Sequence, residues 1–249
     1  MGTYRLDIAY DGTRFSGWAT QPGQRTVQGE LEAALGRVLG EPTRLTVAGR
    51  TDAGVHAFGQ VASFETGGEV PGALRRALNA LTGPDLAVRA VEPAADGFNA
   101  RRSATSRCYR YRLETASVPS PFERERALHW PHRFDRGRAD HCAAALCGVH
   151  DFTAFTPTDS RHRHFHREVS GAGWDDEGGS ILGFEIEADA FLRGMVRALV
   201  GTILEVAAGR REEDDFRRLL GGASRAEAGD SVAARGLYLV RVSYPADRS

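Results

Sequence analysis

The sequence contains no lysine: all 32 of its basic residues are arginine, and 33 acidic residues give a formal net charge of -1. A near-zero net charge gives no general attraction to nucleic acid, so any such binding must depend on where the arginines lie. The codon bias of a GC-rich genome would by itself account for the missing lysine. Cysteine is also scarce, and three residues without framework spacing exclude a disulfide scaffold and fit a reducing compartment.

Long apolar runs are missing as well. The first residues, MGTYRLDIAYDG, lack the apolar segment of a secretion signal, and the most apolar stretch, 194–209, is interrupted by Arg197 and Glu205. We therefore expect a cytoplasmic protein. A hydrophobic content of 41% in 249 residues supports one large core or two small ones, which excludes the disordered and fibrous classes.

Hydrophobic periodicity predicts the same order of elements twice along the chain. The first series comprises strands over 3–10, 43–48, 55–65 and 85–92, with a helix after the N-cap Thr26 and another beginning near Pro71. The second series comprises strands over 106–114, 164–169, 181–189 and 237–244, with helices over 136–147 and 191–208.

Each series is a split β-α-β unit of the ferredoxin-like or RRM-like kind. The predicted fold is therefore α+β, with two such units forming a broad, mostly antiparallel sheet that has helices on one face and a central cleft. We expect an N-terminal domain over residues 1–104 and a C-terminal domain over 105–249. A cleft of this shape suits a structured RNA.

One loop displays a carboxylate between glycines. In AGRTDAGVHAFGQ (48–60), Gly49 and Gly54 permit tight backbone geometry, so Arg50, Thr51 and Asp52 can be aimed away from the sheet. The alternative is an ordinary turn in which Asp52 caps neighbouring amides. The loop connects two strands of the first unit.

The run RRSATSRCYRYR (101–112) holds five arginines and two tyrosines without an acid. Basic residues interleaved with aromatic residues suit phosphates and stacked bases. Tyr109 and Tyr111 share a strand face with Arg107, whereas Arg110 and Arg112 point the other way. The alternative is that both tyrosines are half-buried sheet residues.

Two arginines lie on the flank of the helix over 191–208. Arg193 and Arg197 project beside its apolar stripe, near Gly194 and Gly201. Small residues there let another element approach closely. Such an arginine is either solvated or the partner of a carboxylate from elsewhere.

The histidines at alternate positions 162, 164 and 166 suggest metal ligands, but no matching cysteine or carboxylate shell accompanies them. A second candidate group consists of His141, Cys142, Cys147 and His150. It fares no better, because Cys142 and Cys147 are five positions apart on a helix and point apart. We expect no metal and no cofactor.

Five segments together resemble the tRNA pseudouridine synthase A family in order and spacing over nearly the whole chain. They are GRTDAGVHA, FNARRSATSRCYRYRL, DFTAF, AFLRGMVRALVG and GLYLV. The resemblance of these segments implies the two-domain α+β fold and an isomerase that converts uridines 38, 39 and 40 of the tRNA anticodon arm to pseudouridine. It also implies a homodimer that needs neither cofactor nor metal.

The resemblance implies roles for individual residues. Asp52 is expected to attack the target uridine, with Arg197 as its ion-pair partner. Arg50 would enter the RNA stack and hold the base out, Tyr109 would stack on the flipped uracil, and Leu237 would pack against it. Arg107, in the basic run, is expected to contact the substrate.

Two other classes of function remain open from the sequence. One is a non-catalytic RNA-binding module of two RRM-like units, which would use the arginines and tyrosines but no particular carboxylate. The other is a hydrolase that uses Asp52 as a nucleophile on a small glycoside.

Overall fold

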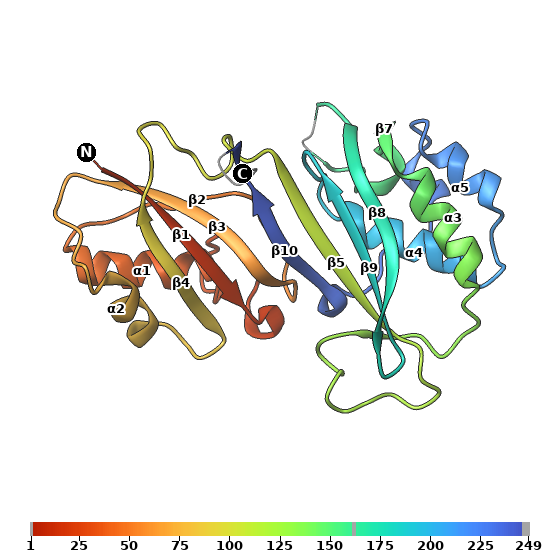
Figure 1. Ribbon diagram of the computed structural model, residues 1–249, viewed down its shortest axis with the longest axis horizontal. Helices are drawn as coiled ribbons and strands as arrows, with labels where there is room; N and C mark the ends of the chain where they lie inside the picture. The colour runs from red at the N-terminus through yellow and green to blue at the C-terminus, as the bar shows by residue number, and fades with distance from the viewer. Residues whose placement is uncertain (1, 161–162, 246–249) are drawn as a thin grey trace. The chain divides into compact units, whose positions relative to one another are not determined.

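The computed structural model describes residues 2–160 and 163–245 (Figure 1). The chain divides into two compact units. The first combines the residues up to Thr105 with those from Tyr238 onward, and the second comprises Ser106–Leu237. The last strand, which we expected within a C-terminal domain, therefore groups with the first unit.

The first unit is a sheet with the strand order β4-β1-β3-β10. The strand β1 is antiparallel to both β3 and β4, β2 pairs with β3, and β10 runs parallel to β3 with Tyr238 opposite His56. The elements are β1 (Gly2–Tyr10), α1 (Val27–Leu39), β2 (Thr46–Val47), β3 (His56–Thr66), α2 (Leu74–Leu81), β4 (Leu86–Pro93) and β10 (Leu237–Ser243).

Local sequence signals explain the helices of this unit. The Thr26 hydroxyl accepts a hydrogen bond from Gly29 N at 3.3 Å, as the predicted N-cap requires, and Gly40 ends α1 in the left-handed region. Leu31 and Leu35 of α1 are fully buried. Because α1 contacts α2 and crosses behind β1 and β4 in Figure 1, its apolar face forms the core with the sheet.

The second unit is a sheet with the order β5-β9-β8-β7, in which every neighbouring pair is antiparallel. The strand β6 pairs with β5 in parallel. The elements are β5 (Ser106–Glu114), β6 (Leu128–His129), α3 (Arg136–Ala145), β7 (Gly148–Asp151), β8 (His166–Gly178), β9 (Ile181–Ala188), α4 (Met195–Ala207) and α5 (Glu213–Leu219). The helix α4 is almost entirely buried and contacts α3 and α5.

The predicted α+β class and the mostly antiparallel pairing are confirmed. Several boundaries differ. The strand β8 continues to Gly178, well past the predicted end at 169, because pairing with β9 outweighs the weak strand propensity of its glycines and acidic residues. The acidic block at 212–215 begins α5, where negative charge at a helix N-terminus is favourable.

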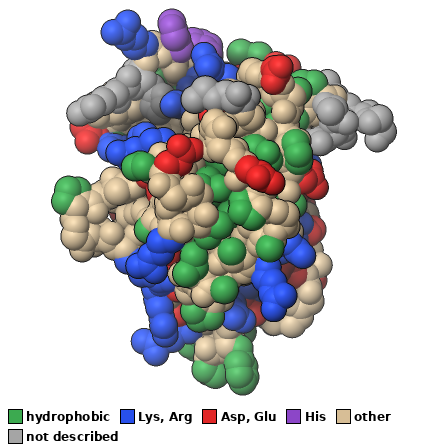
Figure 2. Space-filling view, turned by 90° about the vertical axis from the view of Figure 1, so that its left-hand side faces the viewer, with side chains coloured by type: hydrophobic (Ala, Val, Ile, Leu, Met, Phe, Trp, Pro, Cys, Tyr) green, Lys and Arg blue, Asp and Glu red, His purple; other side chains and the backbone are tan. Residues whose placement is uncertain are grey.

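Two observations bear on the surface. Within the described part of the chain, no helix is long and apolar enough to cross a membrane. On the face shown in Figure 2, arginine, acidic and hydrophobic side chains are interspersed, in keeping with the net charge of -1.

Candidate active site

The loop between β2 and β3 presents Arg50 and Asp52 to solvent and turns Thr51 inward. Arg50 and Asp52 are exposed, whereas Thr51 is only 7% exposed. The expectation that all three side chains point away from the sheet is thus wrong for Thr51. Gly54, with φ +78°, supplies the left-handed turn that brings the chain from Asp52 back into β3.

Thr51 is anchored by a buried hydrogen-bond network. Its hydroxyl lies 2.8 Å from the Tyr10 hydroxyl, which accepts a hydrogen bond from Gln60 Nε2 at 3.2 Å. Gln60 Nε2 also donates to Gly49 O at 2.8 Å, and Thr51 O accepts from Trp18 N. The backbone on both sides of Arg50 is therefore fixed from β1, β3 and the segment after β1.

Burial dominates the chemistry of Tyr10. Desolvation raises its pKa to about 12, although the hydrogen bonds with Thr51 and Gln60 act in the opposite direction. The phenol is therefore neutral across the physiological pH range, and its hydroxyl holds Thr51 and Gln60 in place through hydrogen bonds. The roles of Tyr10 and Gln60 were missed in the sequence, because β3 also carries His56, Ser63 and Thr66, and no local pattern distinguishes Gln60 from these other polar residues of the strand.

Glycines let the segment after β1 pack directly against the loop. A Cβ on Gly17 would lie 2.8 Å from Thr51 O, and one on Gly12 would lie 2.0 Å from Val55 O. Gly12 N donates to His56 Nδ1 at 3.1 Å, and the His56 ring stacks on Tyr238 with centroids 4.6 Å apart. His56 thus ties the end of the loop to β10.

In the second unit, both tyrosines of β5 are buried. Tyr109 is 7% exposed and meets the Phe191 ring edge to face, with centroids 4.9 Å apart. Tyr111 is fully buried and donates its hydroxyl proton to Ala233 O at 2.8 Å. Burial raises the pKa of Tyr111, so its phenol is neutral. Tyr111 is thus a structural anchor for the segment before β10.

Arg197 lies where α4 packs closely against the segment 230–232, a close approach (the seam) that the small residues of the helix predicted. Its Nε donates to Val232 O at 2.7 Å, while Val232 N donates to Arg197 O. Gly201 makes the seam possible, because a Cβ there would lie 1.8 Å from Asp230 O. The contact with Val232 fixes the orientation of the guanidinium on a half-buried flank of α4.

Leu237 lies beside Tyr111 in the second unit, directly after the close contact that Gly236 makes with that ring. It is 7% exposed and follows Gly236, whose Cα lies so near Tyr111 that a Cβ would meet the ring at 2.8 Å. The segment 229–237 therefore links Tyr111, Arg197 and Leu237 through short contacts. This segment was not anticipated from the sequence.

The basic run is less available for binding than its sequence indicates. Arg107 is buried and donates to Asp189 O at 2.8 Å, and Arg110 and Arg112 engage carboxylates that other strands and a loop supply. Arg101 and Arg102 are exposed. Contact of Arg107 with a substrate stays a prediction.

The metal candidates do not assemble in the described residues. There, no group of three or more histidine, cysteine or acidic side chains has an arrangement that could hold a metal ion. His164 and His166 are exposed, Cys142 is buried and Cys147 is exposed, while His162 lies outside the described residues.

Known proteins resemble this chain over nearly its whole length. A family model described as tRNA pseudouridine synthase matches residues 8–101 and 142–245. A tRNA pseudouridine synthase A of Frankia casuarinae is 45% identical, with 98% of this chain and 89% of the relative covered. The Cutibacterium acnes protein of that name is 43% identical (99% and 90% covered), and the Bacillus pumilus one is 38% identical (96% and 98% covered).

Likeness among solved structures is lower. A chain of a Cbf5-Nop10-Gar1 complex aligns with 12% identity over 95% of this chain and 58% of the Cbf5-Nop10-Gar1 chain. The TM-score of 0.39 is too low to support a conclusion. The sequence relatives and the family model are decisive: the chain belongs to the tRNA pseudouridine synthase family.

Proposed function

We propose that this protein isomerises uridines 38, 39 and 40 in the anticodon arm of tRNA to pseudouridine, with Asp52 acting on the glycosidic carbon. The observation that supports this most directly is the Arg50-Thr51-Asp52 loop. It exposes one carboxylate and one guanidinium on a backbone that a buried network holds in place. A preorganised carboxylate is what glycosidic chemistry needs.

The reaction exchanges one bond for another. The N1–C1′ bond breaks, the uracil rotates while it stays bound, C5 bonds to C1′, and the C5 proton leaves to restore the aromatic ring. A carboxylate can stabilise or capture positive charge at C1′ and leave again, as in retaining glycoside hydrolysis. Asp52 either adds to C1′ or takes the 2′ proton to give a glycal, and both routes require the ionised carboxylate.

The other site residues have supporting roles in the proposal. Arg197 is the ion-pair partner of Asp52, and arginine suits this task because its planar fork can grip both oxygens and keeps its proton. The fixed Nε contact with Val232 supports this, since it limits the directions in which the guanidinium can point. Leu237 forms an apolar wall that keeps water from C1′.

Base flipping is the costly step before chemistry. Taking a uracil out of the stack costs on the order of a few kcal/mol. Stacking on Tyr109 returns about 1 to 3 kcal/mol, and Arg50 fills the gap in the RNA. The edge-to-face contact with Phe191 supports the role of Tyr109, because it holds the ring in one orientation. We further propose that the protein is a cytoplasmic homodimer.

The test uses tRNA labelled with tritium at uridine C5. Wild-type protein should release tritium with EDTA present and no cofactor added. The Asp52→Asn variant should release no tritium. Its affinity for tRNA should stay within about tenfold of wild type, because one carboxylate contributes little to phosphate binding. Asp214→Asn, an exposed carboxylate at the start of α5, is the matched control and should behave as wild type. Substantial turnover by Asp52→Asn would refute the proposal.

The same assay separates the alternatives. A glycoside hydrolase would release free uracil, and a non-catalytic RNA-binding module would bind tRNA without releasing tritium in any variant. Tyr109→Phe keeps the stacking surface and should bind normally. A large fall in its rate would assign the C5 proton to the phenol, whereas wild-type turnover would exclude that role.

A further inference from the structure

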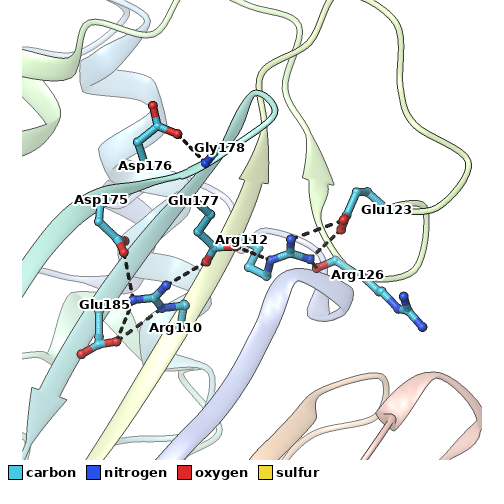
Figure 3. A network of polar contacts seen from close by, with 9 residues as sticks. All are labelled: Arg110, Arg112, Glu123, Arg126, Asp175, Asp176, Glu177, Gly178 and Glu185. Atoms are coloured by element: carbon cyan, nitrogen blue, oxygen red, sulfur yellow. Dashed lines mark hydrogen bonds and ion pairs between the residues drawn. The ribbon is translucent and has the colours of Figure 1, made fainter.

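His56 is a buried histidine that the proposed chemistry does not use. It is the first residue of β3, directly after the loop that carries Asp52 (residues 48–55, the Asp52 loop), and it is 3% exposed. By contrast, Arg110 and Arg112 at the centre of Figure 3 are met by carboxylates of their own unit. The hydrogen bond that a buried imidazole makes depends on which ring nitrogen carries the proton, so His56 has to be examined atom by atom.

The Nδ1 atom of His56 holds the turn that follows β1. Gly12 is the first residue of the 3-10 helix η1 (Gly12–Arg14), so its N–H has no acceptor within that helix. His56 supplies the acceptor, with Gly12 N 3.1 Å from Nδ1. Asp11 Oδ1 lies 3.2 Å from the same nitrogen, but it accepts from Thr13 N at 3.0 Å and from the Thr13 hydroxyl at 2.5 Å. These contacts assign Nδ1 as an acceptor, with the ring proton on Nε2.

The helix η1 backs the far end of the Asp52 loop. Gly12 packs so closely on the loop that a Cβ there would lie 2.0 Å from Val55 O. Val55 N donates to Asp52 O at 3.2 Å, and Gly54 N donates to Phe15 O at 3.4 Å. A shift of Gly12 would therefore reach the backbone of Asp52 through one close contact and one hydrogen bond.

A stack on β10 fixes the ring that carries this nitrogen. The His56 ring stacks on Tyr238, with centroids 4.6 Å apart and ring planes 17° from parallel. The two residues are also opposite each other where β10 pairs with β3, and Tyr238 stacks in addition on Phe58. Because its ring is held from β10 and its Nδ1 faces Gly12, His56 joins three separate parts of the first unit.

We propose that His56 is a positioning residue for Asp52, which sets the carboxylate by holding η1 against the Asp52 loop through Nδ1. The inference rests on the proposed function, because it takes Asp52 as the group that acts on the glycosidic carbon. His56 needs no contact with RNA for this role, since it acts through Gly12 and Val55. A displacement near 1 Å can lower a rate on the order of a hundredfold, so a small shift of η1 is enough to affect catalysis.

The first experiment compares His56→Asn with His56→Gln, two variants that carry the same amide group at different reach. The side-chain oxygen of asparagine lies close to the position of Nδ1, whereas the amide of glutamine lies one bond farther out. We expect His56→Gln to lower kcat for tritium release about tenfold to a hundredfold with KM nearly unchanged, as for a misplaced reacting group. His56→Asn should recover most of this kcat, because it again offers Gly12 N an acceptor.

Two controls separate positioning from a loss of folded protein. Urea unfolding should show that both variants are fully folded under assay conditions, so that their difference in kcat reports the site. Both variants lack the ring that stacks on Tyr238, which leaves the place of the acceptor as the difference between them. His129→Asn changes a half-buried histidine of β6, whose Nε2 lies 2.8 Å from Ala116 O, and should leave kcat and KM near wild type.

The second experiment uses the wild-type protein alone for its result. Nitrogen-15 NMR shifts of the imidazole ring, assigned to His56 by their absence in His56→Asn, show which ring nitrogen carries the proton. At the pH of the activity assay we expect Nδ1 without a proton and Nε2 with one. A proton on Nδ1 would direct the ring to Asp11 in place of Gly12 and would overturn the proposal.

The outcomes distinguish this inference from the proposed function. Wild-type protein that releases no tritium would refute the proposed function and, with it, the role of His56. Active wild-type protein with an unchanged kcat in His56→Gln would refute the positioning role alone. Equal losses of kcat in folded His56→Asn and His56→Gln would also refute it, because the effect would then come from the lost ring. A raised KM with unchanged kcat would assign His56 to RNA binding and overturn the proposal.

Discussion

The buried hydroxyl of Tyr10 offers the sharpest test of how the Asp52 loop is held. Tyr10→Phe removes one oxygen and leaves the packing of the ring on Phe15 and Trp18 intact. The lost oxygen joins Thr51 to Gln60. Gln60 Nε2 keeps its bond to Gly49 O, but the Thr51 hydroxyl loses this partner inside the protein.

The magnitude follows from these contacts. Removing one partner of a buried polar group costs about 1 to 3 kcal/mol of unfolding free energy. The larger effect should fall on catalysis, because Thr51 is adjacent to Asp52 and a displacement near 1 Å can reduce a rate on the order of a hundredfold. We expect kcat to fall by about tenfold to a hundredfold with KM nearly unchanged, since the substitution leaves the exposed side chains of the loop, Arg50 and Asp52, unaltered.

The assay is tritium release together with urea unfolding. Tyr4→Phe is the matched control, because Tyr4 lies on the same strand and its hydroxyl makes no hydrogen bond within the described residues; its ring stacks on Phe64. The control should leave both stability and kcat near wild type. If Tyr10→Phe loses stability but keeps its kcat, the network does not orient Asp52, and the reasoning is refuted.

Three further predictions follow from packing and charge. Because the pKa of Tyr10 is raised from 10.0 to about 12, its contribution to stability is complete below pH 10 and is lost as the pH rises to 12. Wild type should therefore lose up to about 3 kcal/mol relative to Tyr10→Phe over this range in urea unfolding, and an unchanged difference would contradict the burial. Gly201→Ala should destabilise the protein by about 1 to 3 kcal/mol, because its Cβ would overlap Asp230 O, whereas Gly36→Ala in α1 should be neutral or stabilising; equal effects would exclude the tight seam. Binding of tRNA should weaken steeply with salt if exposed arginines such as Arg101 and Arg102 neutralise phosphates, and a flat dependence would argue against this.

Local sequence patterns predict much of the fold. The apolar stripe and Thr26 specify α1, and alternating residues specify β1 and β5, because each element must bury one face. Short pieces such as β6 and β7 carry too few residues to show a period. Their pairing partners, which lie elsewhere in the sequence, determine them.

The basic run shows where local interpretation fails. Within 101–112 there is no acid, so the sequence predicts a phosphate-binding strand. The structure brings Glu177 and Glu185 to Arg110, and Glu177 and Glu123 to Arg112. Charge balance in a sheet is set across strands, and no window along one strand contains that information.

The sequence by itself determined the identity of the chemically distinctive loop, the order of most elements and the likeness to one family. Those properties reside in residue type and spacing. Only the tertiary structure decided that Thr51 turns inward onto Tyr10, that Val232 orients Arg197, and that Arg112 supports a loop. Each of these depends on contacts between residues at least eleven positions apart, which form only when folding buries polar groups that must then find partners.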